Sequence, residues 1–199
     1  MLSNLLILSI VFALGADPVP GASRPPFERL PGAGTPSPRI QEPPHSLIEV
    51  GAAAPDFSYQ TADGHWRHLR ELLGHGPALL VFGANREQLL ALEAERNALL
   101  DNGILPVAVL NEKPARIWSV VRDLSLNYTV LADPRQVVAE QFNVKREDQR
   151  SATPSWFVLN QQGEVRALRR GQLPNAGFNT LASTALGRPV PGAALPASH

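Results

Sequence analysis

Cysteine is absent from all 199 residues of the sequence. Without cysteine the chain can form no disulfide, thiolate nucleophile, iron–sulfur cluster or cysteine-ligated zinc site. An excess of one charge is also lacking, because 18 basic and 18 acidic residues give a formal net charge of zero. No basic run is longer than Arg169-Arg170, so the sequence offers no electrostatic footprint for nucleic acid, and we expect no nucleic-acid partner.

Long hydrophobic runs are scarce, and the main one lies at the N-terminus. Leu5 to Leu14 is too short to span a bilayer, and Ala13 and Gly15 supply small residues at the two positions that a signal peptidase reads. We therefore predict a signal peptide over residues 1–15 and an extracytoplasmic location, periplasmic or secreted, with no membrane span after cleavage. An uncleaved membrane anchor remains the alternative, because the only positive charge in Met1 to Asn4 is the terminal amine.

Proline is plentiful in two flanking segments. Residues 16–46 combine proline with glycine, alanine and serine and hold only isolated apolar residues, so we predict a disordered linker. The alternative interpretation is that this segment binds a partner that recognises proline-rich peptides, through Pro25-Pro26 or Pro43-Pro44. Residues 187–199 are predicted to be a disordered tail, which leaves one domain over residues 47–186.

The domain is organised around an apolar strand, a turn and a helix. Ala78 to Phe82 form an unbroken apolar run, which is typical of a strand covered on both faces. Apolar residues at helical spacing predict a helix from Glu87 to Asp101. The apolar stretch Ile104 to Leu110 predicts a second, parallel strand and so a βαβ unit. Ligands of open α/β sheets gather at strand-to-helix turns such as Gly83 to Arg86.

The remaining patterns predict a hairpin on each side of this α/β core. Before it, two extended pieces flank a turn-forming Asp-Gly pair. After the second strand come a helix, a strand and a helix, then a second hairpin and a last helix. We therefore predict an α/β fold with a central mixed sheet, flanked by helices, and an N-terminal β-hairpin. The first hairpin consists of Val50–Phe57 and Trp66–Leu69 around Asp63-Gly64. The next segments are a helix from Pro114 with Ile117, Trp118, Val121 and Leu124, a strand Tyr128–Leu131, and a helix from Asp133-Pro134 whose buried residues are Val137, Val138 and Phe142. The last are the strands Trp156–Leu159 and Val165–Leu168 and a helix with Phe178, Leu181 and Leu186.

Several of these residues, in this order and spacing, resemble a known family. They look like the thioredoxin-like redoxins and, more narrowly, the alkyl hydroperoxide reductase/thiol-specific antioxidant group that includes peroxiredoxins. The resemblance covers roughly Leu47 to Gly171 and implies a thioredoxin-like fold. It rests on Val50-Gly51, Ala54-Pro55-Asp56-Phe57, Asp63-Gly64, Leu69, Leu79–Phe82, Leu131-Ala132-Asp133-Pro134, Thr153–Asn160 and Gly163.

The resemblance places a reactive cysteine at the start of the helix after the first core strand, where this chain has Asn85-Arg86-Glu87. It also aligns Pro154 with a cis proline that presents the preceding backbone to an extended substrate chain by strand addition. We therefore expect no catalytic residue, cofactor or metal, and an extended polypeptide or protein partner at the former active site. The predicted binding residues are Gly83, Ala84, Asn85, Arg86, Thr153 and Pro154.

Two function classes follow. The favoured one is a non-catalytic binding or scaffold module, because the residues that resemble the family's fold are present and its reactive cysteine is not. The alternative is an antioxidant thiol-peroxidase-type oxidoreductase, as the resemblance alone implies. A metal site at His65, His68 and His75 is less favoured than a solvated loop, and no Gly-x-Ser-x-Gly turn supports a hydrolase. Trp118 and Trp156 are expected in the core, whereas Trp66 fits either the core or a binding surface.

Overall fold

A computed structural model describes residues 47–60, 66–145 and 151–190 of the chain. The predicted signal peptide (1–15) and linker (16–46) lie outside the described residues, as do the predicted Asp63-Gly64 turn and residues 191–199 of the predicted tail. Residues 187–190 form neither helix nor strand. Within the described ranges, no helix combines the length and apolar character needed to cross a bilayer.

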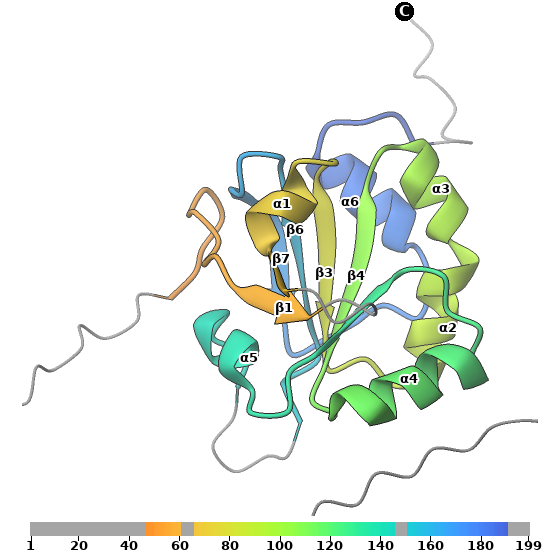
Figure 1. Ribbon diagram of the computed structural model, residues 1–199. Coiled ribbons are helices and arrows are strands. Elements are labelled where there is room, and N and C mark those ends of the chain that lie inside the picture. Colours follow the sequence, from red (N-terminus) through yellow and green to blue (C-terminus); the bar gives the residue numbers. More distant parts are fainter. Residues whose placement is uncertain (1–46, 61–65, 146–150, 191–199) are drawn as a thin grey trace, which may run out of the picture. The chain divides into compact units, whose positions relative to one another are not determined.

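Five strands form one mixed sheet in the order β5-β4-β3-β6-β7 (Figure 1). The parallel strands are β3 (Ala78–Phe82), β4 (Leu105–Leu110) and β5 (Thr129–Ala132). β6 (Ser155–Leu159) runs antiparallel to β3, and β7 (Val165–Arg170) runs antiparallel to β6. The unbroken apolar run of β3 fits its place in the middle of the sheet, covered on both faces. The predicted α/β fold with a central mixed sheet is confirmed.

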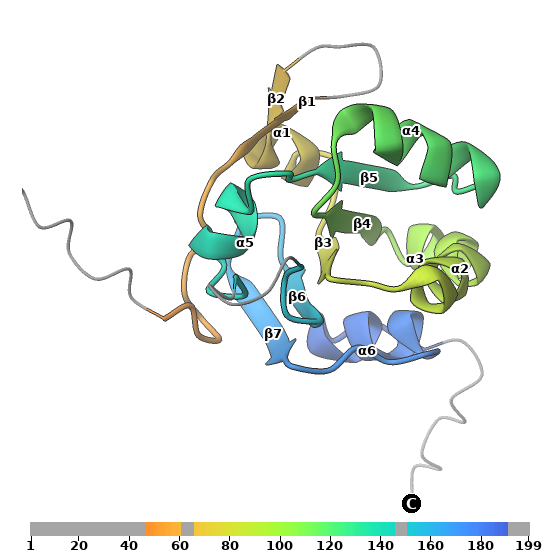
Figure 2. The same ribbon diagram turned by 90° about the horizontal axis from the view of Figure 1, so that it is seen from below.

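Helices cover both faces of this sheet (Figures 1 and 2). Leu79 and Val81 of β3 pack toward the helices α2 (Arg86–Ala94), α3 (Arg96–Asp101) and α6 (Phe178–Ala185). The helix α4 (Pro114–Asp123) packs on that face against β4 and β5, through Ile117 and Leu110. The alternate residues Leu80 and Phe82 pack toward α1 (Leu69–Leu73) and α5 (Val137–Gln141). Alternation along a strand thus divides its side chains between two cores.

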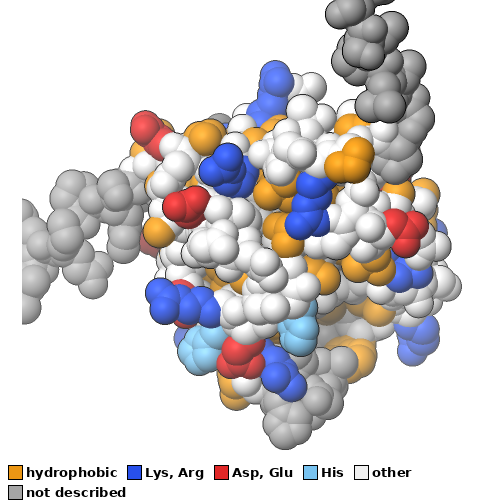
Figure 3. All heavy atoms as spheres, turned by 90° about the horizontal axis from the view of Figure 1, so that it is seen from above, with side chains coloured by type: hydrophobic (Ala, Val, Ile, Leu, Met, Phe, Trp, Pro, Cys, Tyr) orange, Lys and Arg blue, Asp and Glu red, His pale blue; other side chains and the backbone are white. Residues whose placement is uncertain are grey.

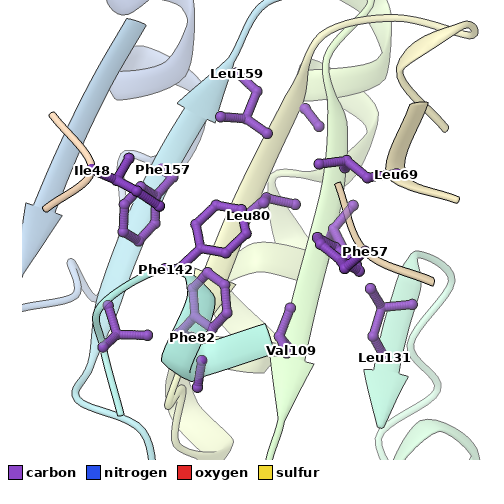
Figure 4. Close-up of a cluster of buried hydrophobic side chains, with 14 of the residues drawn as sticks. Ile48, Phe57, Leu69, Leu80, Phe82, Val109, Leu131, Phe142, Phe157 and Leu159 are labelled. Atoms are coloured by element: carbon purple, nitrogen blue, oxygen red, sulfur yellow. The ribbon is translucent and has the colours of Figure 1, made fainter. Parts of the chain in front are cut away.

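A cluster of phenylalanines fills the core under α5 (Figure 4). The ring centroid of Phe142 lies 5.2 Å from that of Phe82 and 5.1 Å from that of Phe157. Edge-to-face and tilted pairs of this kind contribute about 0.5–1.5 kcal/mol each beyond the burial of their area. The cluster therefore fixes α5, and the segment that follows it, against the end of β3.

Arg170 ties three segments together at the edge of the phenylalanine cluster. Its guanidinium carbon lies 5.3 Å from the ring centroid of Phe157, and its Nη2 donates to the carbonyls of Ile48 and Phe142, at 2.9 and 3.2 Å. Burial lowers the pKa of Arg170, and the charge of Glu49 opposes this shift. The cation thereby links the start of the domain to the end of α5.

The first hairpin differs in its boundaries from the prediction. Its strands are β1 (Ser58–Gln60) and β2 (Trp66–His68), paired antiparallel, so the predicted strand Val50–Phe57 was wrong. That stretch instead crosses the turn between β6 and β7, where the N–H of Gly51 donates to the carbonyl of Val165 at 2.8 Å. The five-residue helix α1, which begins at Leu69, was not predicted.

The predicted helix Glu87–Asp101 is broken into α2 and α3 at Glu95. The Glu95 carboxylate accepts hydrogen bonds from the backbone N–H groups of Gly177 and Asn179, at 2.5 and 2.8 Å. These N–H groups belong to the N-cap and the second residue of α6, and the N-cap, Gly177, makes no side-chain capping bond of its own. The break therefore places a carboxylate where it fixes the last helix.

Three predicted burials need correction. Trp118 was expected in the core, yet it is 50% exposed on α4, because Ile117 and Leu124 occupy the buried side of that helix. Val137 at the start of α5 is likewise exposed. Trp156 is only half-buried and packs against the core on the α6 side of the sheet.

β3 ends in a close approach to the segment before β6. Gly83 has a φ of +63°, and a Cβ atom placed there would lie 2.4 Å from the carbonyl oxygen of Ala152 and 3.1 Å from the nitrogen of Pro154. Such distances are far below van der Waals contact, and a left-handed backbone conformation adds strain for any other residue. Only glycine lets these two segments meet.

We expect Glu95→Ala to lower the free energy of unfolding by about 1–2 kcal/mol, because it removes the acceptor that caps α6. Urea denaturation of both proteins measures the difference. Asp101→Ala, which removes an exposed carboxylate from the neighbouring α3, serves as the control. Equal stability of Glu95→Ala and the wild type would contradict the capping role.

We expect Gly83→Ala to destabilise the protein by at least about 2 kcal/mol, since it adds a steric clash to the cost of a positive φ. Gly171→Ala is the matched control, because Gly171 has a φ of +84° but open space around it. Thermal unfolding of the two variants separates the cost of the steric clash from the cost of the positive φ. The contact with Ala152 would be discounted if both substitutions lowered the melting temperature equally.

Candidate functional site

The turn from β3 into α2 holds the residues predicted from the sequence. Asn85 is the N-cap of α2: its Oδ1 accepts from the backbone N–H of Gln88 at 2.9 Å, and Gln88 Oε1 accepts from the N–H of Asn85 at 3.0 Å. This reciprocal capping box satisfies two N–H groups that a helix start leaves free. Asn85 therefore serves the helix, at the position where the resemblance implies a cysteine.

Thr153-Pro154, the segment predicted to face this turn, lies just before β6. The structure brings Gly83 against Pro154, because Ser155 pairs with Phe82 and the two segments meet where the strands end. The N–H of Thr153 donates to the carbonyl of Val144 at 2.8 Å, and its carbonyl accepts from Ser155 Oγ at 2.9 Å. The donor that strand addition would use is therefore already engaged, whereas the carbonyl keeps a second lone pair.

A groove of about 920 Å³ opens beside the turn, at the carboxyl ends of β3 and β4. Figure 2 looks onto this end of the sheet, with α4 on one side and the segment leading into α2 on the other. We call it the β3–β4 groove. It is lined by Gly83, Ala84, Arg86, Leu89, Leu110, Asn111, Glu112, Lys113, Arg116, Val120, Asp123, Leu124, Pro134, Ser151 and Ala152.

The groove includes part of the predicted site and omits the rest. Gly83, Ala84 and Arg86 line it, whereas Asn85, Thr153 and Pro154 do not. Its second wall, from Glu112 along α4, was missed by sequence reasoning. A signal was present, because Lys113-Pro114 marks a helix start directly after a buried strand, as Asn85-Arg86 does.

The groove combines an apolar floor with a charged rim. Leu89, Leu110 and Leu124 are buried beneath it, and Arg86, Lys113 and Arg116 are exposed at its edge. Among the described lining residues, the only side-chain hydroxyl belongs to Ser151, and none is a histidine. The lining therefore offers apolar and charged surfaces to a ligand, and its ionisable groups are the carboxylates of Glu112 and Asp123 and the three cations.

A second cavity, of about 690 Å³, lies at the opposite end of the sheet. Tyr59, His75 and Tyr128 are among its lining residues. Burial raises the pKa of Tyr128 above its ordinary value of 10.0, with a smaller contribution from the charge of Glu93, and its hydroxyl donates to the carbonyl of Leu89 at 3.1 Å. Burial likewise raises the pKa of Tyr59. Figure 3 shows this end of the molecule, where acidic and basic side chains are interspersed among uncharged ones.

The histidines considered as metal ligands do not form a described cluster. His68 Nδ1 lies 3.3 Å from Ser58 Oγ on the first hairpin, and His75 lines the second cavity. His65 lies outside the described residues. In the part of the chain that the structure describes, no three His, Asp or Glu residues are close enough together to hold a metal ion.

Comparison with solved structures relates the fold to peroxiredoxins. The protein is similar to the peroxidoxin BcpB of Mycobacterium tuberculosis, with 19% identity and a TM-score of 0.64 over 70% of this chain and 97% of that one. It is also similar to PrxQ of Xylella fastidiosa, with 11% identity and a TM-score of 0.62 over 71% and 97% of the two chains. A third similar structure is AhpC of Enterococcus faecalis, with 15% identity and a TM-score of 0.60 over 71% of this chain and 92% of that one.

Comparison with the curated proteins finds no match. A family model, described as the AhpC/TSA family, matches residues 50–168, which is more than half of the chain. The matched range begins before the first hairpin and ends within β7, so it includes β3, the start of α2 and the whole β3–β4 groove. The chain therefore belongs to the AhpC/TSA family.

Proposed function

We propose that this chain is an exported, non-catalytic binding module that holds an extended segment of a protein partner in the β3–β4 groove. The observation that carries the proposal is a helix cap at the position where the resemblance implies a reactive thiol: Asn85 completes the capping box of α2, and the sequence contains no cysteine. The export part of the proposal rests on the apolar N-terminal run and the proline-rich stretch after it.

The geometry of the groove supports binding along its length. It joins the start of α2 to the face of α4 that carries Arg116, Val120 and Asp123, which are spaced one turn apart. A segment lying there would meet apolar contacts from below and charged side chains along the rim. Because the N–H of Thr153 is engaged by Val144, we place the main contacts in this groove and a lesser one at the Thr153 carbonyl.

The alternative is the thiol-peroxidase activity that the family suggests. It would need a nucleophile that attacks peroxide without sulfur, and a hydroxyl such as that of Ser151 is far too weak at neutral pH unless a base activates it. No histidine lines the groove in the described part of the chain. A binding role requires no such group and makes direct use of the exposed cations.

Wild-type protein is expected to consume hydrogen peroxide no faster than buffer when a thiol reductant is supplied. The physical reason is the missing thiolate, which is the group that reduces peroxide in thiol chemistry. Peroxide loss is followed with the protein in large excess over trace metal and with a peroxiredoxin as the positive control. Turnover above the buffer blank would overturn the non-catalytic part of the proposal.

Capture of partners from an extracytoplasmic fraction is expected to depend on the groove. Arg86→Ala should reduce recovery severalfold, and Thr153→Ala should reduce it less, because the backbone of Thr153 remains in place. Arg169→Ala, which removes an exposed cation from β7, is the matched control and should recover as much as the wild type. Equal recovery with all four proteins, measured by quantitative mass spectrometry, would move the binding site elsewhere.

A further inference from the structure

We infer that the segment held in the β3–β4 groove is acidic, an inference that rests on the proposed function and specifies its partner. Three cations stand on the rim: Arg86 at the start of α2, and Lys113 and Arg116 at the start of α4. Within the part of the chain that the structure describes, the side chains of these three residues form no hydrogen bond or ion pair. They are therefore available to an external anion.

The acidic residues of the groove neutralise little of this charge. Asp123 Oδ1 lies 3.3 Å from the guanidinium of Arg122 on the same helix, and both side chains are exposed. Asp123 therefore pairs with Arg122 and not with one of the three rim cations. Glu112 is the remaining carboxylate of the lining. Both helices also begin at this end, and the positive ends of their dipoles add to the field of the three cations. The N-cap of α4, Lys113, has no side-chain capping bond.

The floor of the groove decides what kind of anion fits. Leu89, Leu110, Val120 and Leu124 provide apolar contacts between the charged edges. A peptide that alternates carboxylates with apolar side chains would place one set over the floor and the other against the cations. A strand of duplex DNA carries one charge about every 3.4 Å, and it has no alternating apolar side chains to place over the floor. An acidic, amphipathic protein segment suits the groove better.

Fluorescence anisotropy with the full chain tests the inference. The probe is a short labelled peptide of alternating Asp and Leu, and its matched control replaces each Asp with Asn. We expect the acidic peptide to bind at least about tenfold more tightly, and to lose most of this advantage when salt rises to about 1 M, where the Debye length falls to about 3 Å. A single-stranded oligonucleotide of equal charge is expected to bind more weakly than the acidic peptide.

Charge reversal locates the binding. The double variant Lys113→Glu/Arg116→Glu should weaken binding of the acidic peptide at least about tenfold and should favour a matched Lys and Leu peptide. Acidic residues are favourable near a helix N-terminus, so α4 should remain folded, which circular dichroism checks. Arg169→Glu makes the same kind of change on β7 and should leave the affinity unchanged.

The inference would be overturned by equal binding of the Asp and Asn peptides, by an equal loss of affinity in the Arg169→Glu protein, or by stronger binding of the oligonucleotide. Absence of detectable binding by the acidic peptide at low salt would overturn it as well. The proposed function fails separately. If partner capture depends on Arg86 while the acidic peptide has no advantage, the groove binds a partner of another charge and the proposed function stands.

Discussion

The close approach between the end of β3 and the segment before β6 is the contact on which the rest of the site depends. Gly83 permits it, because a Cβ atom at this position would lie 2.4 Å from the carbonyl oxygen of Ala152. The phenylalanine cluster of Phe82, Phe142 and Phe157 holds the same two strands from below. With both strand ends fixed, the turn into α2 and the groove beside it have a defined position.

A thiol site and a binding groove make different demands on this position. A thiolate needs the N–H groups and the dipole at the helix start, together with a nearby cation, to lower its pKa. In this chain Asn85 takes up one of those N–H groups in a capping box, and Arg86 stays exposed. The turn consequently stabilises α2 and presents a cation to the groove, which is what a contact surface requires.

Sequence patterns predicted the elements whose signal is local. β3, β4 and β6 appeared as apolar runs, β7 was predicted as the second strand of a hairpin, and Pro114 marked the start of α4. The break at Glu95 could not be predicted, because its carboxylate accepts from Gly177, 82 positions further along the chain. The exposure of Trp118 and the wall that α4 gives to the groove likewise depend on how α4 lies against β4 and β5. Gly83 to Arg86 was found from the strand-to-helix rule, and the same rule applied to β4 and α4 would have found Lys113 and Arg116.

We propose that the β3–β4 groove is the contact surface of this protein. Two-dimensional NMR of the isotope-labelled chain during titration with the acidic amphipathic peptide tests it most directly, because each backbone amide reports on its own surroundings. We predict that the largest shift changes occur at Ala84, Arg86, Lys113 and Arg116. Shift changes confined to the cavity around Tyr59 and Tyr128, or to β7, would contradict it.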